Sequence, residues 1–170
     1  KSLHDWAEKT KSKTDELIST LHDENAENLK KVEAYNQLQK LYPSELKNLT
    51  LQQFLLMNAV DANNMLTKAI NERKIATEKA NVESIKDEIS KADKSISEYK
   101  EKVFNNDGSK YNIADALYAA KHLRDLEDRR QQLKNNYDNA VKDVVQSYKD
   151  RIAAEALGEQ QEEQAKTLRE

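Results

Sequence analysis

Apolar residues recur at steps of three and four along most of the chain, with polar and charged residues between them. This spacing places the apolar side chains on one face of an α-helix. It extends over three stretches, at about residues 2–42, 50–103 and 113–157. Helix-breaking residues are rare, with one Pro and two Gly in 170 residues. The pattern predicts an all-α protein, an elongated antiparallel bundle or coiled coil of three long helices.

Local signals set the expected ends of the first helix and the start of the second. The residue before a proline is biased out of the helical region, so the first helix should end at Tyr42, before Pro43. Residues 22–28 add only one apolar side chain to the helix face, which allows a break or bend there. Thr50 and Gln53 match a capping box, in which each side chain bonds the other residue's backbone N–H. We therefore expect the second helix to open at Thr50.

The third helix is expected to follow a polar turn. Residues 105–112 are the clearest break in the second half of the chain, with Gly108 suited to a positive φ angle and Asn112 to capping the next helix. This turn lacks the carboxylates that a calcium-binding EF-hand loop needs at its first and last positions. Gly158 predicts the end of the third helix, with residues 158–170 as a frayed tail.

The second and third helices carry heptad seams that pair across this turn. Because the turn is short, the two helices should fold back on each other as an antiparallel hairpin, with large residues facing small ones. The seam of the second helix changes register between Ala76 and Ile85, which changes the local winding. The first helix should run back along the second and complete a three-helix bundle. The predicted packing residues of the seams are Leu55, Leu66, Ile85, Ile89, Ile96, Tyr99, Val103, Leu117, Leu123, Leu126, Leu133, Tyr137 and Val144.

Two sets of residues have two interpretations each. Arg73 and Arg130 occupy seam positions, where they either cover the seam with their aliphatic stems or fix register and partner choice. The apolar cluster between Leu46 and Met57 either packs as core at the end of the bundle or forms an exposed patch for a protein partner. The candidate residues of that patch are Leu51, Phe54, Leu55 and Met57.

The composition is that of a coiled coil rather than of a compact globule. Charged residues make up 35% of the chain and apolar residues 37%, and the mean hydropathy is −0.99, which allows a narrow seam and not a thick core. The 28 basic and 31 acidic residues are interspersed, which argues against a nucleic-acid-binding face. No apolar run approaches the ~20 residues that span a bilayer. We expect one elongated bundle over residues 1–170 and, since the sequence starts without Met, a segment of a larger protein.

The sequence carries no pattern of residues that indicates catalysis or cofactor binding. The three histidines lack the spacing of metal ligands on a helix, and cysteine is absent, so disulfides and thiolate sites are excluded. The abundant carboxylates lack the Glu-x-x-His pattern of di-metal bundles. Glycine-rich phosphate loops and motifs around a Ser or Cys nucleophile are missing as well. We therefore expect a protein that is not an enzyme and that holds no cofactor or metal.

One segment resembles a known family. A helix ending in Leu-Tyr-Pro at residues 41–43, then Leu-Lys-Asn-Leu at 46–49, then a long helix rich in Lys, Glu, Ala and Ile resembles the tail tape-measure proteins of phages and prophages of Bacteroidetes-type bacteria. The resemblance covers roughly residues 30–103. It implies a virion protein that lies inside the tail tube and sets tail length in proportion to its helical length. A folded-back hairpin departs from the extended ruler that the family implies.

The resemblance also implies partners and a location. The partners would be tail-tube subunits, assembly chaperones and further copies of the chain, which implies a homo-oligomer. The location would be the cytoplasm during assembly and then the virion tail. Two other classes fit the helical pattern: an antiparallel coiled-coil arm of a cytoplasmic chromosome-maintenance or repair ATPase, and a receptor-binding helical rod of a secreted protein. A phosphate-binding loop upstream of the chain would indicate the ATPase, and further helical repeats would indicate the tape measure.

Overall fold

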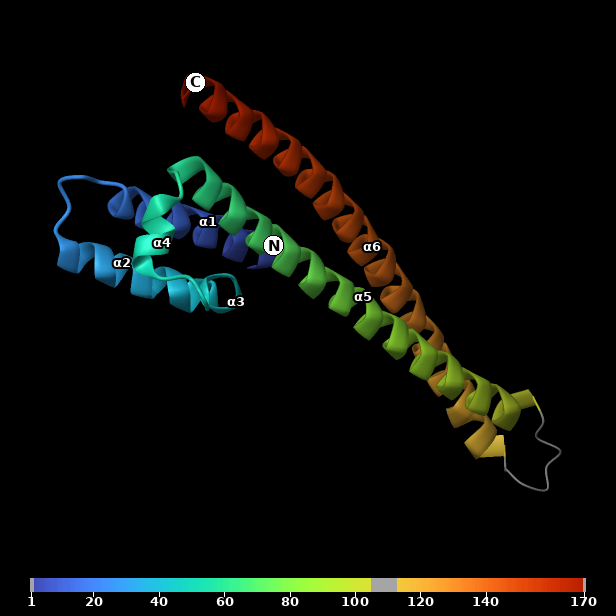
Figure 1. The fold of residues 1–170 in the computed structure, drawn as a ribbon. Coiled ribbons are helices and arrows are strands. Elements are labelled where there is room, and N and C mark those ends of the chain that lie inside the picture. Colours follow the sequence, from blue (N-terminus) through green and yellow to red (C-terminus); the bar gives the residue numbers. More distant parts are fainter. Residues whose placement is uncertain (1, 105–112, 170) are drawn as a thin grey trace. The chain divides into compact units, whose positions relative to one another are not determined.

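The computed structural model describes residues 2–104 and 113–169. Every secondary-structure element in these residues is an α-helix (Figure 1), so the all-α prediction is confirmed. The chain divides into two compact units: unit 1 comprises Lys1–Ala76 and Gln146–Glu170, and unit 2 comprises Thr77–Val145. The turn predicted at residues 105–112, with Gly108 and Asn112, lies outside the described residues. The helices are α1 (Ser2–Leu21), α2 (Asn28–Leu41), α3 (Pro43–Leu46), α4 (Leu51–Leu56), α5 (Ala59–Phe104) and α6 (Ile113–Arg169).

The single helix predicted over residues 2–42 is wrong, because α1 and α2 are separate helices. The interruption falls on the stretch with one apolar residue, where the sequence allows a break. There the side chain of Asp23 accepts a hydrogen bond from the backbone N–H of Asn25 at 2.9 Å, and the N–H of Ala26 bonds the carbonyl of Asp23 at 3.1 Å. These local bonds give the backbone an alternative to the helical ladder. As expected, α2 ends before Pro43.

The second predicted helix is also divided. Its start is correct, because Thr50 and Gln53 form the reciprocal capping box, with hydrogen bonds of 3.1 and 2.9 Å. Its continuity is wrong, because α4 ends at Leu56 and Met57 is extended. Asn58 then starts α5: its side-chain oxygen accepts from the N–H of Asp61 at 2.7 Å, and its amide donates to the Asp61 carboxylate at 2.9 Å. A second cap therefore restarts the helix.

The third predicted helix extends twelve residues further than expected. The sequence predicts an end at Gly158, whereas α6 continues through Gly158 to Arg169. Gly158 is buried against Asn64 of α5, and a Cβ at this position would lie 3.3 Å from the Asn64 side chain. The glycine here allows close approach of two helices within unit 1 rather than ending one of them.

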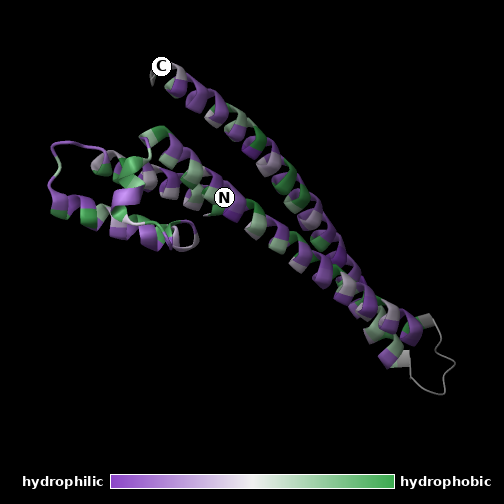
Figure 2. Ribbon diagram, in the orientation of Figure 1, coloured by the Kyte–Doolittle hydropathy of each residue, from purple (hydrophilic) through white to green (hydrophobic). Residues whose placement is uncertain are grey.

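The core of unit 1 is formed by α1 to α4 and the first turns of α5. Its largest fully buried side chains include Tyr42, Phe54, Leu38 and Leu66. Hydrophobic and hydrophilic residues are interspersed along the helices (Figure 2). The core residues come from every one of these helices: Leu17, Ile18, Leu21, Ala34, Tyr35, Leu38, Tyr42, Leu46, Phe54, Ala62, Leu66, Ala69 and Ile70.

Unit 2 consists of the second part of α5 and the first part of α6, which run antiparallel. Arg130 on α6 is ion-paired with Asp93 on α5, and Arg129 lies 3.6 Å from Glu88. This pairing agrees with the predicted hairpin. The buried apolar residues of the unit form a narrow line along the two helices: Ile96, Ala119, Leu123, Leu133 and Ala140. Along α5, the boundary between the units follows Ala76, where the sequence predicts the change of register.

Candidate functional site

A charged side chain joins α5 to the end of α2 in unit 1. Arg73 donates a hydrogen bond from Nη1 to the carbonyl oxygen of Leu41 at 2.6 Å and another from Nη2 to the carboxylate of Glu45. Its guanidinium lies 5.3 Å from the centre of the Tyr42 ring. Leu41 is the last residue of α2, so its carbonyl has no partner within the helix, and a cation is favourable there. We call Arg73, Leu41, Tyr42, Glu45 and Thr14 the Arg73 junction.

The Arg73 junction continues into α1 through two hydroxyl groups. Thr14 uses its single hydroxyl hydrogen to donate to the carbonyl of Thr10 at 2.7 Å. Its oxygen lies 2.6 Å from the Tyr42 hydroxyl, so Tyr42 is the donor to Thr14. Burial raises the pKa of the Tyr42 phenol, and the Thr14 hydrogen bond and the charge of Arg73 offset part of that rise. The phenol is therefore a neutral hydrogen-bond donor at physiological pH. The polar contacts of Thr14, Tyr42 and Arg73 together connect α1, the end of α2 and α5.

A second tyrosine holds the segment before α4. The Tyr35 hydroxyl donates to the carbonyl of Leu49, and its ring centre lies 5.4 Å from that of Phe54 in a tilted arrangement. Burial raises the pKa of Tyr35, as it does for Tyr42. Because the buried phenol has a hydrogen-bond partner, the ring can fill the core without leaving an unpaired polar group.

The predicted partner patch is wrong, because its residues belong to the core of unit 1. Phe54 is 0% exposed, and Leu51, Leu55 and Met57 pack against the same core. The alternative interpretation, that these residues are core, is the one that the structure supports. The exposed apolar residue of α4 is Leu56, at 87% exposure, which the prediction did not include. A six-residue helix buries one face, and Leu56 is on the other.

Most predicted seam residues are buried or half-buried, and one is exposed. Leu66, Ile96, Leu123 and Leu133 are buried, and Leu117 is 67% exposed. The assignment of Leu117 to the seam is wrong, because Leu117 is exposed, whereas Ala119, two positions further along the helix, is buried. The half-buried seam residues are Leu55, Ile85, Ile89, Tyr99, Val103, Leu126, Tyr137 and Val144.

Arg130 in unit 2 was predicted at a seam position, like Arg73 in unit 1, but its ion pair is more exposed to solvent. Its side chain is 38% exposed and pairs with Asp93, whose side chain is 51% exposed. Nearer the end of the hairpin, the centre of the His122 ring lies 4.6 Å from that of Tyr99 on α5 and 6.0 Å from that of Tyr118 on α6. The Tyr99–His122 contact and the Arg130–Asp93 ion pair connect α5 to α6 within the unit.

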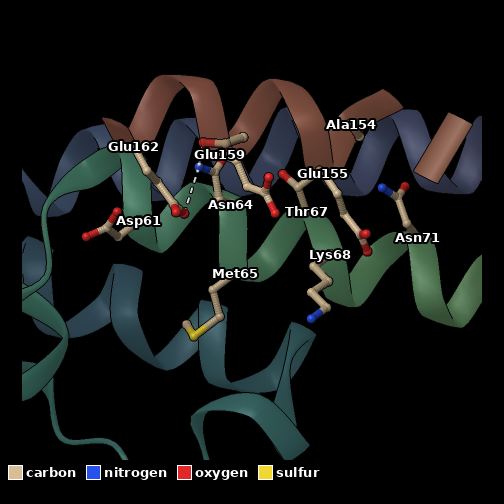
Figure 3. A pocket seen from close by; sticks show the side chains of 11 residues that line it. Asp61, Asn64, Met65, Thr67, Lys68, Asn71, Ala154, Glu155, Glu159 and Glu162 are labelled. Carbon is tan, nitrogen blue, oxygen red and sulfur yellow. Dashed lines mark hydrogen bonds between the residues drawn. The ribbon is translucent and has the colours of Figure 1, made fainter. Parts of the chain in front are cut away.

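A polar cleft of about 420 Å³ lies between α5 and the last turns of α6 in unit 1. In Figure 3, Asn64 extends from α5 toward α6, where its amide lies 3.2 Å from the carbonyl of Gly158 and 3.2 Å from the carboxylate of Glu162. The same cleft is lined by Lys68 and by the carboxylates of Asp61, Glu155 and Glu159. Asn64 thus fixes the end of α6 against α5, and sequence reasoning missed it because a lone Asn in a polar helix gives no signal.

Comparison with known proteins finds no relative: no protein-family model matches the chain, and no curated protein or solved structure matches it. Within residues 2–104 and 113–169, no group of acidic or histidine side chains is arranged to hold a metal ion. In the same residues, none of the helices combines the length and the apolar content needed to cross a membrane. The hydrogen bonds of Arg73 and Asn64 and the ion pair of Arg130 join segments that are far apart in the sequence.

Proposed function

We propose that the chain is a structural segment of a phage or prophage tail tape-measure protein that helps to set or scaffold tail assembly. The observation that carries the proposal is helix length: α6 runs for 57 residues and α5 for 46 without interruption. At about 1.5 Å per residue, a helix converts residue number into distance linearly, and 57 residues correspond to about 85 Å. The resemblance of residues 30–103 to the tape-measure family supports the same role.

The expected partners of such a segment are other proteins. Tail-tube subunits, assembly chaperones and further copies of the chain would contact the outer faces of α5 and α6, in the cytoplasm during assembly and later in the virion tail. Single apolar side chains on α6, such as Ile152 at 62% and Leu157 at 55% exposure, are available for these contacts. In this role the chain is an elongated scaffold without catalysis.

The test is a change of helix length in the phage or prophage that encodes the chain. Residues 79–92 of α5 and 127–140 of α6 pair in the predicted hairpin, so removing both stretches shortens each arm by fourteen residues and keeps the seam. Mean tail length, measured by electron microscopy, should fall by about 21 Å if the hairpin persists in the tail and by about 42 Å if the chain is extended. A variant with Lys86→Ala and Lys91→Ala, both exposed positions, keeps the length and is the control. Tails that assemble at unchanged length contradict the proposal.

The antiparallel pairing in unit 2 supports one alternative. Ion pairs such as Arg130 with Asp93 fit an arm of a chromosome-maintenance or repair ATPase, in which two helices run out and back. For such an arm, the paired deletion leaves tail length unchanged. The sequence upstream of the chain in its gene distinguishes the two roles, because the ATPase requires a phosphate-binding loop there.

A further inference from the structure

The last turns of α6 carry a second stripe of residues beside the face that packs on α5. The packed face includes Gly158, which lies against Asn64 of α5. The residues of the second stripe follow one another at steps of four, three and four, and all of them are exposed: Leu157, Gln161, Gln164 and Leu168. These steps are those of the a and d positions of a coiled coil. A helix that already packs on α5 therefore presents a further seam to solvent.

The charges of this segment are kept away from the stripe. Four of the twelve residues from 157 to 168 are charged, and all four occupy the outer heptad positions b, c and f: Glu159, Glu162, Glu163 and Lys166. The positions that flank the stripe are uncharged: Gly158, Gln160, Ala165 and Thr167. The Thr167 hydroxyl donates to the carbonyl of Glu163 at 3.0 Å, so it is satisfied within the helix. In a segment this rich in charge, an uncharged face is the pattern of a helix that pairs with another helix.

The order of residues in the stripe is the same from either end: Leu, Gln, Gln, Leu. If two copies pair antiparallel, Leu157 of each copy meets Leu168 of the other, and Gln161 meets Gln164 in the two central layers. A glutamine amide both donates and accepts, so these central layers can be hydrogen-bonded. The uncharged flanks place no like charges opposite each other. A second copy of the chain thus offers a complementary residue at every layer of the stripe.

A groove of about 550 Å³ lies beside the stripe in unit 1, between the end of α6, α1 and the start of α5. Its apolar lining includes Ile18 of α1, Val60 of α5 and Leu168 of α6. In the antiparallel pair, Leu157 of the second copy arrives next to Leu168, where this groove opens. Because a two-fold axis relates the copies, the same contact forms twice. The contact surface therefore extends from the helix pair into the groove.

We propose that the last turns of α6 form a homodimer interface, in which two copies of the chain pair antiparallel through Leu157, Gln161, Gln164 and Leu168. The proposal rests on the proposed function in one respect, that further copies of the chain are among its partners, and it names the surface and the orientation of that contact. The helix pair has only four layers, two of them polar, so the dimer is a weak one with a dissociation constant in the micromolar range.

The first test is sedimentation equilibrium of the full chain over a range of concentrations. The wild-type chain should pass from monomer to dimer, and the double variant Leu157→Glu and Leu168→Glu should stay monomeric, because it places carboxylates opposite each other in the outer layers. Leu56→Glu is the matched control, since Leu56 is an exposed leucine of α4 outside the stripe. A wild-type chain that is monomeric up to millimolar concentration overturns the proposal, as does a dimer that persists in the double variant.

The second test determines the orientation by cross-linking. The chain contains no cysteine, so single cysteines report on one position each. An equimolar mixture of Leu157→Cys and Leu168→Cys should form mixed disulfide dimers on mild oxidation. Neither variant should do so alone, because its two thiols lie about 16 Å apart along the axis of the antiparallel pair, at about 1.5 Å per residue. Dimers formed by one variant alone, or none in the mixture, overturn the antiparallel pairing.

The third test strengthens the interface instead of breaking it. Gln161→Leu combined with Gln164→Leu should lower the dissociation constant of the dimer at least about tenfold, because polar residues at seam positions reduce the stability of a coiled coil. An unchanged or weaker dimer would place the two glutamines outside the interface and overturn the proposal. All three measurements use the purified chain, so their outcome is separate from that of the tail-length experiment on the tape-measure role.

Discussion

Units 1 and 2 each contain part of α5 and part of α6, but they bury different amounts of apolar side chain. In unit 1, α5 packs with α1 to α4 around a core that contains fully buried aromatic residues, Tyr42 and Phe54. In unit 2, α5 and α6 meet along a line in which small residues such as Ala119 and Ala140 alternate with Ile and Leu. Burial of apolar area is the main source of stability, so the two parts of one continuous helix should differ in stability.

The polar contacts of unit 1 are also more numerous around its seam arginine than those of unit 2. Arg73 in unit 1 bonds a helix-terminal carbonyl and Glu45 over the Tyr42 ring, whereas Arg130 in unit 2 has one carboxylate partner in a more exposed setting. Two parts of one continuous helix therefore belong to units with different packing. The difference between the units is set by what packs on the helix, not by the helix itself.

The largest effect is expected from removing the centre of the unit 1 core. Phe54→Ala should destabilise unit 1 by about 3–5 kcal/mol, because it removes a fully buried ring and leaves a cavity. Leu56→Ala, on the same short helix but 87% exposed, should change stability by less than about 0.5 kcal/mol. Urea unfolding followed by Trp6 fluorescence measures both. Equal losses for the two variants would show that α4 is not part of a packed core.

The sequence predicted the helical class, the capping box at Thr50 and the antiparallel pairing of unit 2, because each follows from local spacing. It did not predict the break at Met57, although Asn58 and Asp61 form a cap motif that could have shown it. The apolar repeat continues on both sides of Asn58, so this cap looks like the interior of one helix. Helix propensity is too weak a signal to reveal a break that tertiary contacts decide.

The candidate site was predicted less well than the fold. Arg73 was identified by its seam position, but its partners at Leu41 and Glu45 depend on how α2 lies against α5, which spacing along one helix cannot show. The buried Thr14–Tyr42 bond was missed for the same reason. Gly158 was predicted to end a helix, as glycine often does. Its role instead depends on Asn64, which lies 94 residues away in the chain. Local signals therefore identified the elements, and long-range contacts decided their roles.

A smaller effect is expected at the two arginines. Arg73→Lys should cost about 1–2 kcal/mol, because an ammonium group cannot keep the planar fork that reaches both Leu41 and Glu45. Arg130→Lys should cost less than about 0.5 kcal/mol, as usual for exposed ion pairs. Parallel urea titrations read by circular dichroism and by Trp6 fluorescence compare the two. A larger loss of stability for Arg130→Lys than for Arg73→Lys would contradict the stronger role assigned to the arginine of unit 1.

The smallest effect concerns alkaline pH. Burial raises the pKa of Tyr42 in the folded state, so the folded chain keeps a proton that the unfolded chain releases above its ordinary pKa of about 10. Stability is then full below about pH 10 and falls as the pH rises through the pKa of the folded state. Tyr42→Phe should cost about 1 kcal/mol at pH 7 through the lost Thr14 bond and should reduce the alkaline slope. The remaining slope should come from Tyr35, whose pKa burial also raises. The measurement is the free energy of unfolding of the wild-type chain and of Tyr42→Phe between pH 8 and 11. An equal fall in stability with pH for both proteins would contradict this assignment.

Native-state amide hydrogen exchange along α5 tests most directly whether the two units differ in stability on one helix. Residues 62–75 pack in the core of unit 1, and residues 80–103 line the narrow seam of unit 2. The amides of 62–75 should exchange at least tenfold more slowly than those of 80–103, with the change near Ala76, since protection follows local burial and packing. Uniform protection along α5, or slower exchange in residues 80–103, would contradict the division into a stable core and a thin hairpin.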